Sequence, residues 1–212
     1  MLPLLSIIIP AYKRAKQVRK TLELIYKSNG WKKRYIPEDI ISDASPDDSV
    51  KKIIPKFVNP APIYHRPDKP GIAASKNSAM KRTNFEIIII CDSDMEVEFD
   101  TLINTLTYLK GHPTAAMVSG QIIWKGGQKS GELDRPRKED RIKTVDGTDY
   151  IEAIYSRFFA TYKSLFWQAR GYDEEIFNMR GEGSDLSIKY WRSGFPLAYT
   201  DRIRVHHVHE AE

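Results

Sequence analysis

The sequence predicts an α/β protein with a doubly wound, mostly parallel central sheet. Apolar runs of strand length alternate with amphipathic stretches of helical period from residue 4 to about residue 124. The run IIIIC at residues 87–91 has no polar alternation, which is typical of a parallel strand covered on both faces. Asp92 and Asp94 follow it directly, and open α/β sheets bind ligands at the carboxyl ends of their strands. Taken alone, this stretch fits a solvated turn as well as a metal or phosphate site.

The first half of the chain divides into alternating strands and helices. Its first helix is predicted by apolar residues at 3-4-3 spacing between Ala15 and Ile25, and Asn29-Gly30 supplies a C-terminal stop. A short helix with acids in its first turn is expected at 46–57. Strands are expected at 4–12, 38–45, 62–65, 87–91 and 115–124, and helices at 14–30, 46–57, 69–83 and 98–112.

The second half is less regular. Residues 125–147 carry four glycines and about a dozen charges with almost no apolar periodicity, which predicts a long loop of the functional or disordered kind. An aromatic stretch (150–167), a turn (171–175), a helix near 183–194 and a strand (197–207) follow it. A nucleotide-binding half followed by a more variable substrate half would have this pattern.

The composition is that of a globular protein with one sizeable core. Of the 212 residues 41% are apolar and 29% are charged, with a net charge of +5. Basic and acidic residues are interleaved along the chain, so no dedicated nucleic-acid face is expected. Cys91 is the single cysteine, which excludes an internal disulfide, and its apolar surroundings predict a buried thiol. The N-terminal stretch is too short for a membrane span and lacks a basic region, so a cytoplasmic location is expected.

Polar side chains stand where three of the first four predicted strands end. They are Tyr12, Asp43 and the pair Asp92 and Asp94. An aromatic ring can stack on a nucleobase, a carboxylate can accept a base N–H, and Mg²⁺ or Mn²⁺ prefers carboxylate and phosphate oxygens together. In an extended segment the Asp-x-Asp spacing directs both carboxylates to the same side. The residues therefore favour a nucleotide site with a divalent cation.

Six segments in this order resemble the family 2 glycosyltransferases, which have the GT-A fold. They are LSIIIPAYKR, ISDASPDDS, PGIAASKNSAM, IIIICDSDMEVE, GYDEEIF and GSDLSIKYWRSGF, and together they cover about residues 4 to 209. No single motif is specific, but six in register are. The resemblance implies a single GT-A domain over 1–212, with a nucleotide-sugar-binding half (1–124), a mobile loop (125–148) and an acceptor and catalytic half (149–212).

The resemblance also implies roles for the residues at the strand ends. Asp43 matches the carboxylate that reads the uracil N3–H in many members, and Asp94 is the expected direct metal ligand of the Asp-x-Asp pair. The residues expected to bind the nucleotide sugar are Pro10, Ala11, Tyr12, Asp43, Lys76, Asp92, Ser93 and Asp94. The chain departs from the family where Ser42-Asp43-Ala44-Ser45 replaces Asp-Asp-Gly-Ser and where Lys76 replaces arginine, losing the bidentate fork.

Two acids compete for the role of general base, which an inverting transfer needs to deprotonate the acceptor hydroxyl. Alignment on DLSIK places Glu182 on the family's glutamate and Gly183 on its usual catalytic aspartate. A two-residue slip, with a local insertion, would instead make Asp185 the base, and this is the assignment that we favour from sequence. The two acids lie three apart, so both could point into one cleft if the helix begins early. Asp185 also suits the N-terminal end of a helix dipole.

Three of the five histidines lie close together in RVHHVHE. In several GT-A enzymes a late histidine completes the metal shell, and His207 fits that pattern best, with His206 or His209 as alternates. The resemblance thus gives Asp94, Asp92 and His207 as candidate ligands for Mn²⁺ or Mg²⁺.

The prediction is a metal-dependent inverting glycosyltransferase that uses a UDP-sugar. Its expected acceptor is a glycan, a lipid-linked sugar or a protein, and peripheral association with the inner face of a membrane would suit such a role. One alternative is a non-catalytic sugar-nucleotide-binding domain with a degenerate base site. Another is a nucleotidyltransferase, which is disfavoured because PAYKRAK offers no glycine-rich phosphate loop after the first strand.

Overall fold

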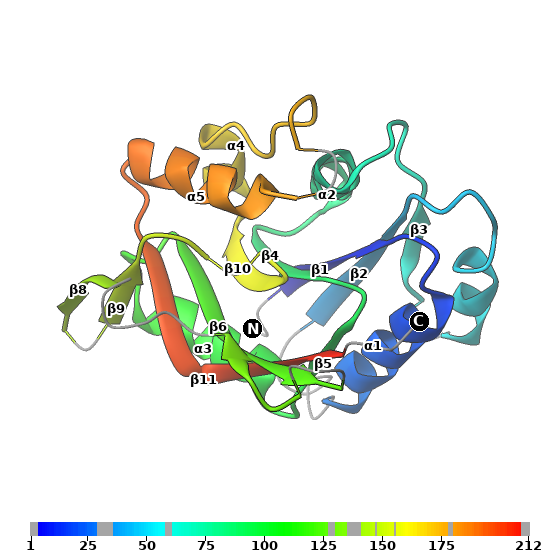
Figure 1. Ribbon diagram of the computed structural model, residues 1–212, viewed down its shortest axis with the longest axis horizontal. Helices are drawn as coiled ribbons and strands as arrows, with labels where there is room; N and C mark the ends of the chain where they lie inside the picture. The colour runs from blue at the N-terminus through cyan, green and yellow to red at the C-terminus, as the bar shows by residue number, and fades with distance from the viewer. Residues whose placement is uncertain are drawn as a thin grey trace.

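A single mixed sheet forms the centre of the molecule. The computed structural model describes residues 4–28, 36–57, 61–126, 130–134, 141–146, 148–154, 156–177 and 180–208. Within this part of the chain the strands follow the order β3-β2-β1-β4-β10-β6-β11-β9-β8, with β5 paired to β11 and β7 paired to β6. Helices cover both faces (Figure 1).

The N-terminal side of the sheet is parallel, as predicted. Its strands are β1 (Leu4–Ala11), β2 (Ile36–Asp43), β3 (Ile63–His65) and β4 (Ile87–Cys91). β1 pairs with both β2 and β4, and β2 pairs with β3, all in parallel. The β4 strand has the predicted bounds, and the Cys91 side chain is fully buried, as expected.

The other side of the sheet mixes both directions. Strand β10 (Phe158–Tyr162) runs antiparallel to β4 and to β6 (Met117–Lys125), and β11 (Leu197–Val208) is parallel to β6. Short antiparallel strands complete it, namely β5 (Met95–Val97), β7 (Leu133–Asp134), β8 (Arg141–Val145) and β9 (Thr148–Ile151). Strand direction thus changes at β10.

The segment at 125–148 is not the loop that its composition predicts. Within its described residues lie β7, β8 and the beginning of β9. The described part of β8 is exposed, and this strand pairs with β9 alone at the edge of the sheet. A strand in that position is held by backbone hydrogen bonds and needs no apolar alternation, so the sequence pattern gave no signal for it.

Five α-helices of the described chain form the two outer layers. Figure 1 shows α1 (Ala15–Lys27) and α3 (Thr101–Gly111) on one face of the sheet. The other face carries α2 (Ile72–Arg82), α4 (Lys163–Gln168) and α5 (Glu182–Arg192). The helix expected at 46–57 is shortened to a 3-10 helix at Lys51–Lys56, which contains Pro55. No described helix is long and apolar enough to cross a membrane.

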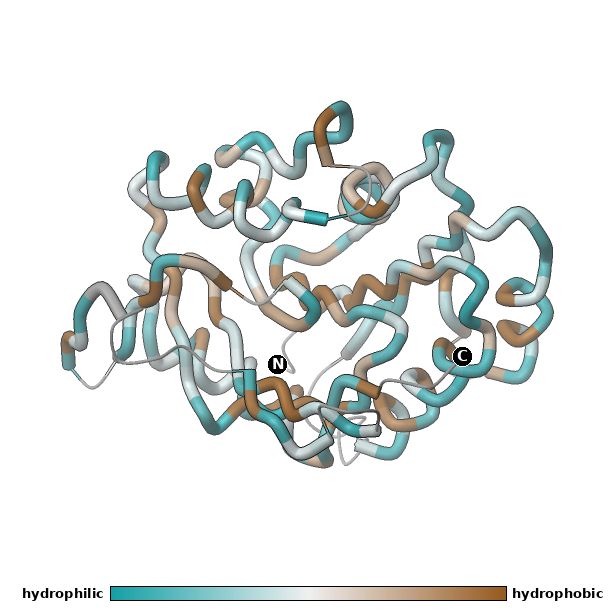
Figure 2. Tube along the Cα trace, in the orientation of Figure 1, coloured by the Kyte–Doolittle hydropathy of each residue, from teal (hydrophilic) through white to brown (hydrophobic). Residues whose placement is uncertain are grey.

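Two apolar cores, one on each face, explain why the central strands lack polar alternation. Ile7, Ile9 and Ile89 face the core under α1 and α3, whereas Ile8 and Ile88 face the core under α2 and α5. Successive side chains of a strand point to opposite faces, so both sets of residues must be apolar. The hydropathy colouring follows this layout, with apolar residues along the central strands and polar ones on the outer surfaces (Figure 2).

A bulge in β11 directs its second half toward the end of β4. Thr200 pairs with Gly120 and Arg204 pairs with Gln121, so the three residues 201–203 of β11 have no pairing partner in β6. Ile203, within this bulge, is fully buried against Gly120. A Cβ atom on Gly120 would lie 2.2 Å from the Ile203 carbonyl oxygen. The glycine is therefore required for the bulge to close on β6.

We expect Gly120→Ala to destabilise the protein by about 2 kcal/mol or more, because the added methyl group meets backbone that cannot rotate away. Chemical denaturation monitored by circular dichroism measures the change. The matched control is Gly111→Ala at the end of α3, where a Cβ atom has no neighbour within 4 Å. That variant should equal or slightly exceed the wild type, since alanine favours the helix. Equal stabilities of the two variants would contradict the role given to Gly120.

Candidate functional site

The predicted site residues gather along one edge of the sheet. Strands β1, β2 and β4 are parallel, and two antiparallel pairings through β10 bring β6 and β11 into the same direction. Their carboxyl ends therefore share an edge, whereas β10 begins there. Tyr12, Asp43, Asp92 and Asp94 follow the strands β1, β2 and β4, or end them, and His207 stands near the end of β11.

The side of the edge formed by β1 and β2 carries a buried carboxylate and an exposed ring. Oδ1 of Asp43 accepts the Ser45 N–H at 3.0 Å, and Oδ2 accepts the Tyr64 hydroxyl at 2.9 Å. The Tyr12 side chain is exposed, while Pro10 and Ala11 are buried and their backbone lies at the end of β1. The hydroxyl of Tyr64, a residue not singled out from the sequence, thus fixes the Asp43 carboxylate.

Asp94 and His207 lie against each other, although 113 residues separate them. Nε2 of His207 is 3.3 Å from Oδ2 of Asp94, and both side chains are about nine-tenths buried. Arg14, at the N-terminus of α1, donates from Nη1 to the same oxygen. Burial on its own raises the pKa of Asp94, but His207 and Arg14 outweigh it and hold that pKa below its ordinary value.

This pair fits a small divalent cation. A carboxylate oxygen and an imidazole nitrogen suit Mn²⁺ or Mg²⁺, which take their remaining oxygen ligands from substrate phosphate and water. The described residues contain no group of three or more metal-ligating side chains, so substrate would complete such a shell. His206 faces away, with Nε2 3.0 Å from Glu98, and the alternate His209 lies outside the described residues.

The other acid of the pair, Asp92, belongs to a different cluster. Its Oδ1 is 3.2 Å from the ammonium group of Lys76, which also lies 3.2 Å from Oε1 of Glu182. The Lys76 side chain is wholly buried. Burial tends to lower its pKa, but Asp92 and Glu182 outweigh that effect and raise it. Burial raises the pKa of Asp92 to about 6 in spite of Lys76.

The two candidate bases have different surroundings. Glu182 is the first residue of α5, is buried, and points to Lys76. Oδ2 of Asp185 is 2.7 Å from Lys189 on the same helix, and Lys189 also donates to the Gly171 carbonyl. The contacts of Asp185 therefore run along α5 and away from the acids of the strand edge. Glu182 is the acid that the fold brings to Asp92.

Residues that precede β10 also reach the site, which the sequence did not indicate. The Arg157 carbonyl accepts the Asp92 N–H at 2.8 Å, and the Ser156 carbonyl accepts from Lys76 at 3.2 Å. The Arg157 guanidinium lies 5.4 Å from the ring centre of Trp124, whose ring packs edge-on against His207 at 4.4 Å. Arg157 and Trp124 thus border the Asp94–His207 pair on the side away from Asp43.

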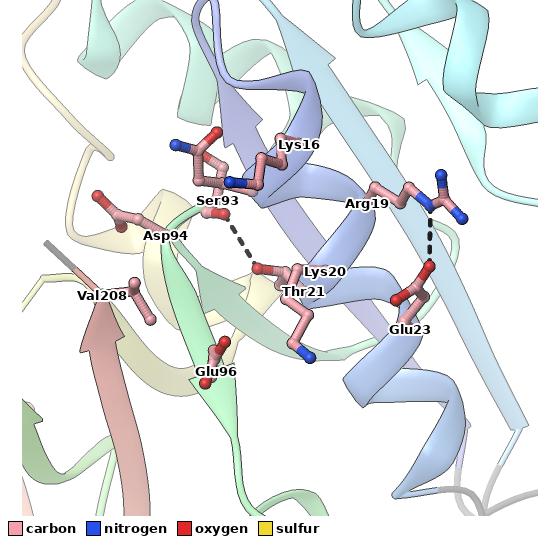
Figure 3. A pocket seen from close by; sticks show the side chains of 10 residues that line it. Lys16, Arg19, Lys20, Thr21, Glu23, Ser93, Asp94, Glu96 and Val208 are labelled. Atoms are coloured by element: carbon pink, nitrogen blue, oxygen red, sulfur yellow. Dashed lines mark hydrogen bonds and ion pairs between the residues drawn. The ribbon is translucent and has the colours of Figure 1, made fainter. Parts of the chain in front are cut away.

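A cavity of about 440 Å³ adjoins Asp94 on the side of α1. Figure 3 shows it between α1, β5 and the end of β11. The Thr21 hydroxyl closes its floor by donating to the carbonyls of Ser93 and Met95 at 3.0 and 2.9 Å. Ser93, expected to contact the nucleotide, thus has its carbonyl turned toward α1. The residues that line the cavity are Lys16, Gln17, Arg19, Lys20, Thr21, Glu23, Ser93, Asp94, Glu96 and Val208.

Replacing the buried lysine tests the network. We expect Lys76→Met to lower the free energy of unfolding by about 3–5 kcal/mol at pH 8, because the buried Glu182 and the largely buried Asp92 would lose their counter-ion. Lys81→Met is the matched control, since Lys81 is exposed on the same helix, and should change stability by under about 1 kcal/mol. Urea titration of both variants measures the effect, and similar losses in the two would contradict the network.

Solved structures with this fold cover nearly the whole chain. GalNAc-T7 crystallised with UDP, GalNAc and Mn²⁺ superposes with a TM-score of 0.79 at 18% identity, over 100% of this chain and 45% of that one. S. aureus TarS 1–349 gives 0.77 at 17% identity, over 98% and 60%. A mannosyltransferase from Pyrobaculum calidifontis, in complex with GDP-Man and Mn²⁺, gives 0.72 at 19% identity, over 97% and 57%.

Sequence comparison gives the family. N-acetylgalactosaminyltransferase 4 of Drosophila melanogaster is 24% identical over 179 residues, which are 76% of this chain and 27% of that protein. The chain therefore spans about a quarter of that relative and less than two thirds of each structure above. The model of glycosyl transferase family 2 matches residues 6–177. Because that match covers most of the sequence, the chain belongs to glycosyl transferase family 2.

Proposed function

We propose that this chain is the catalytic domain of a metal-dependent glycosyltransferase acting on a nucleotide-diphosphate sugar. One observation carries the proposal: Asp94 and His207 meet at the sheet edge next to the cluster of Asp92, Lys76 and Glu182. A two-ligand cation site beside a buried acid suits the transfer of a group away from a diphosphate. The family and the Mn²⁺ in two structures of the same fold support it.

Asp94 and His207 would hold Mn²⁺ or Mg²⁺, and Arg14 would have to leave the Asp94 oxygen when the cation binds. The cation, when bound, supplies a positive charge that stabilises the leaving diphosphate. Among candidate donors we favour a UDP-sugar, because the Asp43 carboxylate could accept the uracil N3–H once the Tyr64 hydroxyl leaves Oδ2. A guanine base also offers N–H donors, so a GDP-sugar is the competing donor.

For the chemical step we favour Glu182 as the general base of an inverting displacement. The acceptor hydroxyl gives its proton to the Glu182 carboxylate while its oxygen bonds to the anomeric carbon. The bond from that carbon to the diphosphate oxygen breaks, and its electron pair leaves with the diphosphate. Lys76 keeps Glu182 in place, and burial of the network limits access of water to it. The acceptor would be a glycan, a lipid-linked sugar or a protein, and a lipid-linked sugar would be reached through peripheral association with a membrane.

Nucleotide binding is tested by thermal shift with UDP, GDP and dTDP, each with and without Mn²⁺. A nucleotide at 100 times its Kd stabilises the fold by about 2.7 kcal/mol, which raises Tm by roughly 5–10 °C for a chain of this size. We expect UDP with Mn²⁺ to give the largest shift. Asp94→Ala should abolish the Mn²⁺-dependent part, and Asp201→Ala, at an exposed position in the bulge, should keep it.

A flat response of the wild type to every nucleotide would contradict the proposal. A Mn²⁺-dependent shift that survives in Asp94→Ala would place the cation elsewhere.

Turnover tests the base. Glu182→Gln should lower the rate of donor consumption by roughly 10²–10⁴ while the nucleotide-induced shift in Tm remains. Asp185→Asn is the matched control on the same helix and should stay within about threefold of the wild type. The reverse ranking would assign the base to Asp185. Nucleotide binding without turnover in the wild type would instead indicate a non-catalytic sugar-nucleotide-binding domain.

A further inference from the structure

Glu182 stands between two glycines that are required for different reasons. Gly181 has a φ of +92° and begins the turn into α5, so its backbone conformation favours glycine. Gly183 is an ordinary helical residue, but a Cβ atom there would lie 2.3 Å from Cβ and 2.7 Å from Oγ of Ser156. The space beside Glu182 that a side chain at position 183 would fill is therefore occupied by Ser156.

Ser156 contacts both partners of the buried ion pair. Its hydroxyl donates to Oε1 of Glu182 at 3.3 Å, and its carbonyl accepts from Lys76 at 3.2 Å. Its own position is fixed by the start of β10, because the following carbonyl, of Arg157, accepts the Asp92 N–H and Phe158 pairs with Cys91. A residue held so firmly can orient the carboxylate that it touches.

Both donors to Glu182 reach the same oxygen. Lys76 and Ser156 approach Oε1, and no side chain of the described residues donates to Oε2. A carboxylate offers about four lone-pair positions, two on each oxygen, so these two donors satisfy Oε1 and leave Oε2 with its capacity to accept.

We propose that Ser156 is a positioning residue, which together with Lys76 holds Oε1 of Glu182 and leaves Oε2 to take the acceptor proton. Ser156 fits beside Glu182 because position 183 is a glycine, without a side chain. The inference rests on the proposed function, since it assigns an atom of the general base. It gives Ser156 no contact with substrate. The hydroxyl acts on Glu182, and Glu182 acts on the acceptor.

Ser156→Ala is the direct test, because it removes the hydroxyl and keeps the Cβ atom that packs on Gly183. We expect kcat to fall about tenfold because the Glu182 carboxylate loses its fixed orientation, with KM for the donor close to wild type and Tm lowered by only a few degrees through the lost hydrogen bond. The control Ser193→Ala removes an exposed hydroxyl at the end of α5 and should leave kcat unchanged. A wild-type kcat in Ser156→Ala would overturn the proposal.

The fit between the two residues is tested by rescue. Gly183→Ala should lower Tm by about 5 °C through overpacking against Ser156, and the double variant Ser156→Gly, Gly183→Ala should recover Tm to the level of Ser156→Ala but not recover kcat. A double variant that recovers both would show that the hydroxyl has no part in catalysis, and one that recovers neither would remove the steric argument.

Failure of the inference can be told from failure of the proposed function. Full activity in Glu182→Gln would reject the base itself, whereas an inactive Glu182→Gln with a fully active Ser156→Ala would reject the role of Ser156 alone. Crystal structures of the wild type and of Ser156→Ala give a readout that needs no turnover. In the variant the carboxylate of Glu182 should keep its contact with Lys76 but turn from the wild-type orientation, and an unchanged orientation would overturn the positioning role.

Discussion

The ammonium group of Lys76 is buried in the interior, where an unpaired charge would cost more than most folds can tolerate. It is accommodated because two carboxylates lie at 3.2 Å and a carbonyl oxygen completes its surroundings. These partners come from three places in the sequence, after β4, before β10 and at the start of α5. The charge on Lys76 can therefore be buried only when the second half of the chain has docked on the first.

The reversed strand β10 explains how the second half reaches the site. Because β10 runs against β4 and β6, its amino end lies where the other strands have their carboxyl ends. The chain enters this edge at Ser156 and Arg157, whose carbonyls bind Lys76 and the Asp92 N–H. A wholly parallel sheet would bring only residues that follow strands to this edge. The mixed sheet brings backbone carbonyls to this edge, and that of Ser156 adds a third acceptor for the buried Lys76 ammonium group.

The parts of the structure that the sequence predicts are those governed by burial and by the local periodicity of apolar residues. The apolar run at 87–91 predicts β4, because a strand with apolar side chains on both faces is stable only between two apolar layers. Polar residues at strand ends led to Asp43 and Asp94, whereas His207 came from the family resemblance. A search for polar residues at strand ends cannot find Ser156, which precedes a strand. It also misses Tyr64, which reaches Asp43 only because β3 pairs with β2.

The long-range register of paired strands is harder to predict from sequence. The bulge of β11 depends on Gly120 and Ile203, which are 83 residues apart and carry no shared local signal. Helical spacing lets Glu182 and Asp185 face one cleft, and the sequence favours Asp185 as the base. Their partners separate them in the structure, since Glu182 meets a lysine of α2 and Asp185 meets one on its own helix.

Arg14 and Lys76, the basic partners of the Asp-x-Asp pair, also distinguish its two acids. The Arg14 side chain is half exposed, so it can leave Asp94 and regain its hydration at a cost typical of surface ion pairs, below about 1 kcal/mol. Lys76 has no such path, because its removal from Asp92 would leave a buried ammonium group short of one counter-ion, at about 3–5 kcal/mol. A cation arriving from solvent therefore displaces Arg14 more easily than Lys76. This difference in burial, together with the imidazole of His207 beside it, favours Asp94 as the metal ligand and leaves Asp92 to anchor Lys76.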